Sequence, residues 1–285
     1  MIEIEEKKEN FCRLCGSYFV KPFKEPLWKC LACSFCFIPV SKDRETEILR
    51  QYSLDQVSTA AYYKKTVEID KKNFYQRLKT IERFICPTTL VDIGSSVGTF
   101  SELAQEFGWQ SLAFEPNSVA ASLAEQKGLR IINDFFSFEA CQKNSLTSFD
   151  CAVLNDVLEH VVDPVSLLKD VGKILNVNGL VVITTPNIDS YFCRRYQIKP
   201  AEHLVYFSKK TLRQILENNG FEVLLCQSVS RFRHVAAAAK NPTATLSVFD
   251  KIIGFIAKIN FINFFLAWGL KIFVKDEIFI IGRKK

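Results

Sequence analysis

Short apolar segments alternate with amphipathic segments from residue 88 onward. The apolar segments are rich in β-branched residues, as buried parallel strands are, and the amphipathic segments repeat their apolar positions every three or four residues, as helices do. The pattern predicts strands at 89–93, 110–115, 129–132, 150–155, 179–185 and 221–228, and helices at 98–107, 117–127, 164–176 and 208–219. This alternation is typical of an α/β fold built on a parallel sheet.

Further elements flank this central region. Residues 41–85 read as helical, because apolar side chains recur there at spacings of three and four: Phe74, Leu78, Ile81, Phe84 and Ile85. The last ten residues, 276–285, contain an apolar run that predicts one more strand. The pairs Asn178-Gly179 and Asn219-Gly220 are typical of helix ends, so we expect the preceding helices to finish there.

The first predicted strand turns into its helix through the segment TTLVDIGSSVG, residues 88–98. Gly94 and Gly98 leave backbone N–H groups open to a ligand at the start of the helix. The G-x-G-x-x-G pattern of dinucleotide sites is missing. Instead, Asp92 precedes the turn and Glu115 ends the next strand. A carboxylate at Glu115 can accept hydrogen bonds from two ribose hydroxyls, and one at Asp92 suits an ammonium group, which together favour S-adenosylmethionine.

With these residues the sequence resembles the class I S-adenosylmethionine-dependent methyltransferases, whose first motif runs acidic-x-Gly-x-Gly-x-Gly. Ser96 stands where that family usually has its middle glycine. The resemblance implies a Rossmann-like sheet of seven strands with helices on both faces, into which residues 276–285 insert antiparallel. It also implies that Asp134 accepts a hydrogen bond from the adenine amino group and that Phe135 lies against the ring. A turn capped by the Asp134 side chain is the alternative there.

The segment NDVLEHVVDP begins at the end of the fourth predicted strand of the central region. Asn155 lies at the carboxyl end of a central strand, where open α/β sheets bind ligands. The segment resembles that of ubiquinone-biosynthesis O-methyltransferases, in which the acidic-x-x-Glu-His pattern has been linked to a divalent cation. That resemblance makes Asp156, Glu159 and His160 a candidate magnesium site. We favour the alternative, in which His160 is structural or faces the substrate.

His203 belongs to the segment AEHLVYFSKKTL, which also matches the family. The resemblance implies that this segment closes over the methyl acceptor. An imidazole titrates near neutrality, so His203 is a candidate general base for a hydroxyl or amine acceptor. A histidine that only orients the loop is the alternative.

Four cysteines near the N-terminus have the spacing of a zinc ribbon. Cys12-x-x-Cys15 and Cys30-x-x-Cys33 each offer a pair of sulfur ligands for tetrahedral zinc. The alternative is reduced cysteines packed in a small core. Cys36 is interpreted as a buried neighbour. The chain has ten cysteines and no apolar leader at its start, so we expect a reducing, cytoplasmic setting in which clustered cysteines bind metal.

Positive charge is concentrated at the end of the chain. Residues 231–285 hold ten Lys/Arg against three Asp/Glu, and residues 1–40 hold six against five. The near-neutral ribbon argues against nucleic-acid binding. Residues 245–275 combine lysines with phenylalanines, a composition that suits a membrane surface, a lipid-linked substrate or a dimer partner, or packing on the protein's own core. The longest uncharged run there has twelve residues, too short to span a bilayer.

These observations divide the chain into a zinc ribbon (1–40), a helical cap over the cofactor (41–87), a cofactor-binding core (88–230), a basic amphipathic helical insertion (231–275) and a final strand (276–285). We expect a cytoplasmic methyltransferase, or one peripheral to a membrane, that acts on a small molecule such as a sugar, a quinone precursor or a lipid-linked intermediate. The alternatives are an RNA methyltransferase with a zinc module and a non-catalytic cofactor-binding scaffold.

Overall fold

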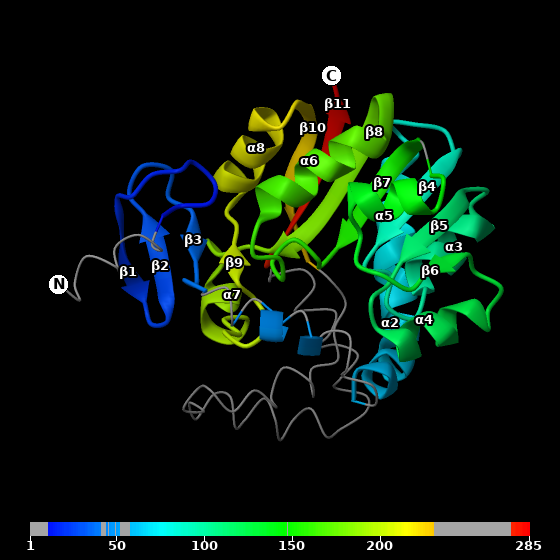
Figure 1. Ribbon diagram of the computed structural model, residues 1–285, viewed down its shortest axis with the longest axis horizontal. Helices are drawn as coiled ribbons and strands as arrows, with labels where there is room; N and C mark the ends of the chain where they lie inside the picture. Colours follow the sequence, from blue (N-terminus) through cyan, green and yellow to red (C-terminus); the bar gives the residue numbers. More distant parts are fainter. Residues whose placement is uncertain are drawn as a thin grey trace.

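A seven-stranded sheet forms the main body of the protein (Figure 1). The structure is a computed structural model that describes residues 11–40, 44, 46–48, 50–51, 58–146, 148–230 and 275–285. The sheet order is β10-β11-β8-β7-β4-β5-β6. Its strands are β4 (Thr89–Ile93), β5 (Gln110–Phe114), β6 (Ile131–Ile132), β7 (Phe149–Asn155), β8 (Leu175–Pro186), β10 (Phe221–Val229) and β11 (Glu277–Lys284). All seven were predicted, and β11 inserts antiparallel between β8 and β10 as expected.

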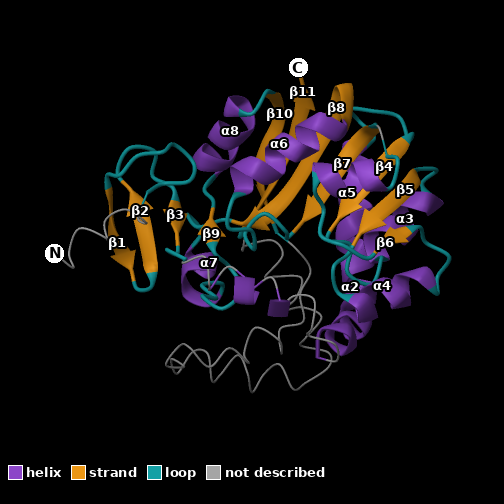
Figure 2. Cartoon of the chain, viewed as in Figure 1, coloured by secondary structure: helices purple, strands orange, loops and turns teal. Residues whose placement is uncertain are grey.

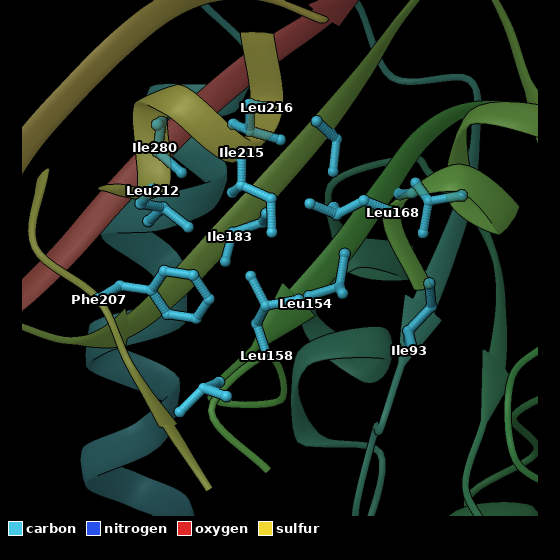
Figure 3. Packing of buried hydrophobic residues seen from close by; sticks show 14 of the residues in the cluster. Ile93, Leu154, Leu158, Leu168, Ile183, Phe207, Leu212, Ile215, Leu216 and Ile280 are labelled. Carbon is cyan, nitrogen blue, oxygen red and sulfur yellow. The ribbon is translucent and has the colours of Figure 1, made fainter. Parts of the chain in front are cut away.

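Helices cover both faces of this sheet (Figure 2). The helices that the structure describes are α2 (Ser58–Ile81), α3 (Thr99–Glu106), α4 (Ser118–Glu125), α5 (Phe138–Lys143), α6 (Pro164–Ile174), α7 (Tyr191–Tyr196) and α8 (Lys209–Asn218), of which α7 lies off the sheet, near β9. Successive strand residues point to opposite faces, so β7 sends Ala152 and Leu154 to one core and Cys151 and Val153 to the other. The first core lies under α6 and α8 (Figure 3), and the second lies under α2 and α3.

The prediction that a helix ends at Asn178-Gly179 is wrong. Helix α6 ends at Ile174, and β8 begins at Leu175. The Asn-Gly pair instead lies where the pairing of β7 with β8 shifts register, and Asn178 has a left-handed backbone with φ 64°. Asn176 Nδ2 donates to Asp150 Oδ1 at 2.7 Å across this irregularity. A turn signal therefore marks a bulge within a strand here, because asparagine tolerates the left-handed conformation that either feature requires.

A small N-terminal ribbon forms a second sheet. It consists of β1 (Val20–Lys24), β2 (Leu27–Cys30) and β3 (Cys36–Phe37). The two-residue strand β9 (Val205–Tyr206), which comes from the main body, completes this sheet in the order β1-β2-β3-β9. Phe35 of the ribbon packs on Phe207 with ring centroids 5.2 Å apart, and both rings are fully buried. Figure 3 shows Phe207 pointing into the core under α6 and α8, so the ribbon is continuous with that core.

The predicted helical cap and the predicted basic insertion are described only in part. The C-terminal half of α2 packs on the sheet beside α3 through Leu78 and Ile81, and its role as a cap over a cofactor stays a prediction. The basic insertion lies outside the described residues, apart from Lys275. Among the helices that the structure describes, none has both the length and the apolar character needed to cross a membrane. The five-part division of the chain remains a prediction.

Candidate functional site

The predicted site residues gather along one edge of the main sheet. Asp92 and Glu115 lie at or just beyond the carboxyl ends of β4 and β5, and Asn155 ends β7. The connections after β4 and after β7 leave in opposite directions, because β4 lies between β5 and β7 in the sheet. Open α/β sheets bind ligands at such a switch point, beyond the carboxyl ends of their strands.

Both glycines of the turn after β4, Gly94 and Gly98, are required by their backbone conformation and by close neighbours. Gly94 has φ 73°, a left-handed conformation that side chains strain, and its N–H donates to Phe114 O at 2.8 Å. A Cβ on Gly94 would lie 2.7 Å from Val157 Cγ2. Gly98 also has φ 73°, but an added Cβ there would overlap Leu129 Cδ1. The second glycine is therefore required by packing of α3 against α4, besides any contact with a ligand.

Ser96 takes the same left-handed backbone as the two glycines, with φ 52°. Its N–H donates to Glu115 Oε2 at 2.7 Å, and Asn117 N–H donates to Glu115 Oε1 at 2.9 Å. The carboxylate is thus fixed between the turn and the start of α4, and each oxygen keeps a further acceptor position. Burial raises the pKa of Glu115. Within the described chain, the hydroxyls of Ser95 and Ser96 are buried without a hydrogen-bond partner, which fits a polar ligand over this turn.

Asp92 is 1% exposed and lies on the α3 side of the sheet. Its Oδ2 accepts a hydrogen bond from Ser101 Oγ at 2.8 Å. Burial, with a smaller contribution from the charge of Glu115, raises the pKa of Asp92 to about 7. A carboxyl group that titrates near neutrality gains its charge readily when a cation binds beside it.

The residues proposed for the adenine lie beyond β6. Asp134 is exposed, and its Oδ1 accepts the N–H of the next residue, Phe135, at 2.8 Å, so its contact with adenine stays a prediction. Phe135 is 37% exposed, whereas the next ring, Phe136, packs edge-on against Phe114. Asn133 Nδ2 donates to Glu115 O at 2.8 Å and so ties this segment to the end of β5.

Asn155 belongs to a buried polar cluster that sequence analysis missed. Its Oδ1 accepts from Arg77 Nη1 at 2.8 Å, and Arg77 Nη2 lies 3.1 Å from Glu277 Oε2. Arg77 and Glu277 are 8% and 0% exposed. Arg77 thereby links α2 to the carboxyl end of β7 and to the start of β11. A signal was present in the sequence, because Arg77 lies three residues after Phe74 and four before Ile81, on the apolar stripe itself.

The second group of site residues follows β7. Asp156 has a left-handed backbone with φ 55°, which is uncommon outside functional or strained turns. Glu159 is 2% exposed, and its Oε2 accepts from Thr185 Oγ1 at 3.0 Å. Burial raises the pKa of Glu159 well above its ordinary value. One ligand atom from each of Glu159, His160 and His203 lies within 4.8 Å of the others. The predicted cation site was Asp156, Glu159 and His160. In the structure the third member of the cluster is His203 and not Asp156.

His160 and His203 meet edge to face, with ring centroids 4.8 Å apart. His160 Nδ1 lies 2.8 Å from Glu202 O, and a carbonyl oxygen only accepts. We therefore assign the proton of neutral His160 to Nδ1, which leaves a lone pair on Nε2. Burial lowers the pKa of His160 and so favours this neutral form. Two imidazoles predicted separately from the sequence thus lie in contact in one cluster.

The four predicted zinc ligands also come together. One sulfur from each of Cys12, Cys15, Cys30 and Cys33 lies within 4.8 Å of the others. The sulfurs of Cys12 and Cys33 are 3.5 Å apart, and those of Cys15 and Cys30 are 3.6 Å apart. Tetrahedral zinc with Zn–S bonds of about 2.3 Å separates its ligands by about 3.8 Å, so the cluster fits zinc. The Cys12 thiol lowers the pKa of Cys33 to about 5 through their hydrogen bond.

Cys36 is 3% exposed and stands outside this cluster. Burial raises its pKa to about 11, so it stays a neutral thiol. Its interpretation as a buried neighbour is confirmed.

Comparisons with known proteins identify the family of the central region of the chain. Residues 63–225 match the model of a methyltransferase domain family. A ubiquinone biosynthesis O-methyltransferase of Caulobacter vibrioides is 30% identical over 103 residues, which cover 35% of this chain and 41% of that protein. Its counterpart in Parvibaculum lavamentivorans is 28% identical over 159 residues, covering 53% and 62%. The chain thus spans less than two thirds of the length of these curated relatives.

A solved S-adenosylmethionine-dependent methyltransferase of Archaeoglobus fulgidus has a similar fold. Its TM-score is 0.55 at 22% identity, and the match covers 78% of this chain and 99% of that one. This identity is low enough that it speaks for the fold alone. The family model covers more than half of the chain, and the sheet has the strand order and antiparallel insertion expected above. The chain therefore belongs to the methyltransferase domain family, with the fold of the class I S-adenosylmethionine-dependent methyltransferases.

Proposed function

We propose that the protein transfers a methyl group from S-adenosylmethionine directly to a small-molecule acceptor. The observation that carries the proposal is the cradle at the switch point: Gly94 and Ser96 in left-handed conformations, with the Glu115 carboxylate fixed beside them. Its buried, unpartnered serine hydroxyls fit a ribose or amino-acid group. S-adenosylmethionine is the cofactor of this fold class, and when bound it supplies an electrophilic methyl group.

The residues of this chain then have distinct roles. Glu115 accepts from the ribose hydroxyls, Asp92 attracts the ammonium group, and Asp134 and Phe135 border the adenine. Gly98 ends the turn after β4, and Asn155 borders the cofactor from the carboxyl end of the neighbouring strand β7. On the acceptor side, His203 or His160 takes a proton from the attacking hydroxyl, amine or carbon acid. His160 suits this role because burial favours its neutral form and its Nδ1 is oriented by Glu202 O, and His203 contacts it edge to face. Alignment of the acceptor supplies the rest of the rate enhancement.

Magnesium does not suit the histidine cluster. Magnesium takes oxygen ligands in octahedral geometry, whereas this group offers one carboxyl and two imidazoles. The carboxyl is that of Glu159, which already accepts from Thr185 and whose pKa burial raises. We therefore assign no magnesium to the mechanism.

The acceptor is a small molecule in this proposal, and a quinone precursor, a sugar or a lipid-linked intermediate are the classes considered. The names of the curated relatives favour the first. Incubating the protein with cell extract and S-adenosylmethionine labelled in its methyl group should label a low-molecular-weight product. Label recovered only in RNA would instead support the RNA methyltransferase alternative. Cofactor binding without transfer to any fraction would support the non-catalytic scaffold.

Affinity for S-adenosylmethionine is expected to rise between about pH 6 and about pH 8. The pKa of Asp92 is raised to about 7, so the carboxyl is largely neutral below this range and charged above it. A cationic ligand binds the charged form better, which makes its affinity increase with pH. Calorimetric titration at three pH values checks this. Asp92→Asn should bind more weakly at the high end and lose the dependence, and an affinity that falls with pH in the unmodified chain would contradict the role of Asp92.

We also propose that the four-cysteine cluster binds one zinc ion. Elemental analysis of the purified protein should find about one zinc per chain, because four thiolates complete a tetrahedral site. Cys33→Ser should lose the metal, whereas Cys86→Ser, which removes an exposed cysteine elsewhere, should retain it. Metal-free protein whose N-terminal region still resists proteolysis would refute the zinc site.

A further inference from the structure

We propose that the metal-bound ribbon positions the acceptor side of the active site, by holding residues 199–207 in place from one side. This segment carries His203, so the inference depends on the proposed function for its catalytic meaning. The alternative is a ribbon that is attached to the enzyme but does not influence the site, as a module that only recruits a partner would be.

The backbone of Leu204, the residue after His203, connects the ribbon to the site directly. Its C=O accepts from Ile38 N–H of the ribbon at 2.8 Å. Its N–H donates to Glu159 O at 2.7 Å, and Val205 N–H donates to the same oxygen at 3.2 Å. Strand β9 therefore lies between β3 and the loop that carries Glu159 and His160. Strand β9 has only two residues and pairs with β3 on the ribbon side, whereas the next residue, Phe207, is held by the main body, since its C=O accepts from Ile188 N–H at 2.9 Å.

Side chains on both faces of β9 continue this connection. On one face, Phe207 packs against Phe35 of the ribbon. Phe35 lies two positions after Cys33, one of the proposed metal ligands. On the other face, Tyr206 lies in a buried cluster with Leu27 and Cys36 of the ribbon. Tyr206 is 1% exposed, its ring centroid lies 6.0 Å from that of His203, and its Oη accepts the N–H of Lys199 at 3.1 Å. Tyr206 thus transmits the position of the ribbon to both ends of the His203 segment.

The geometry of β3 depends in turn on the cysteine cluster. The turn between Cys30 and Cys33 leads into β3 through Ser34, which has a left-handed backbone with φ 70°. The Cys30 N–H donates to Phe35 O at 2.8 Å and closes the turn. A module of this size buries too little apolar surface to hold such a turn alone, so bound metal supplies the folding free energy. Loss of the metal should therefore release β3, and with it one side of β9.

Hydrogen exchange measured by mass spectrometry on the full chain tests this without knowledge of the acceptor. In Cys33→Ser, amides in 199–207 should exchange at least tenfold faster than in the unmodified zinc-bound protein. Amides in 89–98 and 110–115 should keep their protection, and affinity for S-adenosylhomocysteine should stay within twofold, because the cradle strands β4 and β5 belong to the main sheet and the ribbon strands to the other sheet. Cys86→Ser, a matched substitution of an exposed cysteine that is not a ligand, should leave all of these unchanged.

A second variant tests the same connection with the metal still bound. Phe35→Ala keeps the four cysteines and should retain zinc, yet it removes the contact with Phe207 and should also speed exchange in 199–207. Unchanged exchange in 199–207 in both variants would overturn the inference, and so would an equal loss of protection in 89–98. Failure of the unmodified chain to bind S-adenosylhomocysteine would refute the proposed function instead, and it is read from a separate titration.

Discussion

Gly94→Val is expected to abolish measurable binding of S-adenosylmethionine. Gly94 has φ 73°, which a β-branched residue avoids most strongly, and a Cβ there would approach Val157 Cγ2 to 2.7 Å. Backbone strain of this kind costs about 1–3 kcal/mol, and relief of the strain would displace the turn that forms the cradle. Each 1.4 kcal/mol is about tenfold in affinity, so the strain alone can weaken binding by up to about 100-fold. The contact with Val157 adds to this loss, and calorimetric titration measures it.

Gly220→Val provides the matched control. Gly220 has φ 87°, also left-handed, but nothing lies within 4 Å of an added Cβ, and it precedes β10 at the far end of the sheet from the site. This variant should lose stability through the same backbone strain while its affinity for S-adenosylmethionine stays unchanged. If both variants lost affinity equally, destabilisation and not the geometry of the cradle would explain the result.

Arg77→Ala is expected to destabilise the protein more than any surface substitution. Arg77 pairs with Glu277, which is 0% exposed, and donates to Asn155 at the edge of the site. Removing one member of a buried ion pair leaves the other charge without its partner in a region of low polarity, a cost of about 3–5 kcal/mol in the free energy of unfolding. Urea unfolding measures it, and the linked shift of Asn155 should also weaken cofactor binding.

Arg213→Ala is the control for this effect. Arg213, like Arg77, is a helix arginine paired with a glutamate, but the side chains of Arg213 and Glu217 are 46% and 48% exposed. Exposed pairs contribute about 0–1 kcal/mol, so this variant should unfold at nearly the same urea concentration as the unmodified chain. The double variant Arg77→Met, Glu277→Leu should recover much of the stability lost in Arg77→Ala, because it removes both charges of the pair and leaves neither without the other. Equal costs for the two single arginine variants would contradict the proposed role of Arg77.

The main sheet was predictable because its signals are local. A run such as that of β4 is apolar, short and bounded by a glycine turn, and each of these features is visible within a few neighbouring residues. The same holds for the cysteine pairs and for the acidic residues at strand ends. Asp92 and Glu115 could be placed at one edge of the sheet because each lies at the end of a predicted strand, and parallel strands bring their carboxyl ends together.

What the sequence did not predict depends on contacts between distant residues. Strand β9 has two residues and forms only because β3 is there to pair with it, about 170 positions earlier in the chain. Arg77 and Glu277 are 200 positions apart, and only the interruption of an apolar stripe hinted at the first. His160 and His203 were each predicted as candidates, but their contact follows from the hydrogen bonds of Leu204 and Val205 to Glu159, which no local pattern encodes.

The most direct test of the account is a calorimetric titration of the full, unmodified chain with S-adenosylmethionine, S-adenosylhomocysteine and NAD in separate experiments. The account predicts that both adenosyl nucleosides bind at one site per chain and that Glu115→Ala weakens both, because the Glu115 carboxylate holds the ribose and the turn together. It predicts no binding of NAD, whose pyrophosphate has no glycine-rich cradle here. Tight binding of NAD with no binding of either adenosyl nucleoside would contradict the central claim.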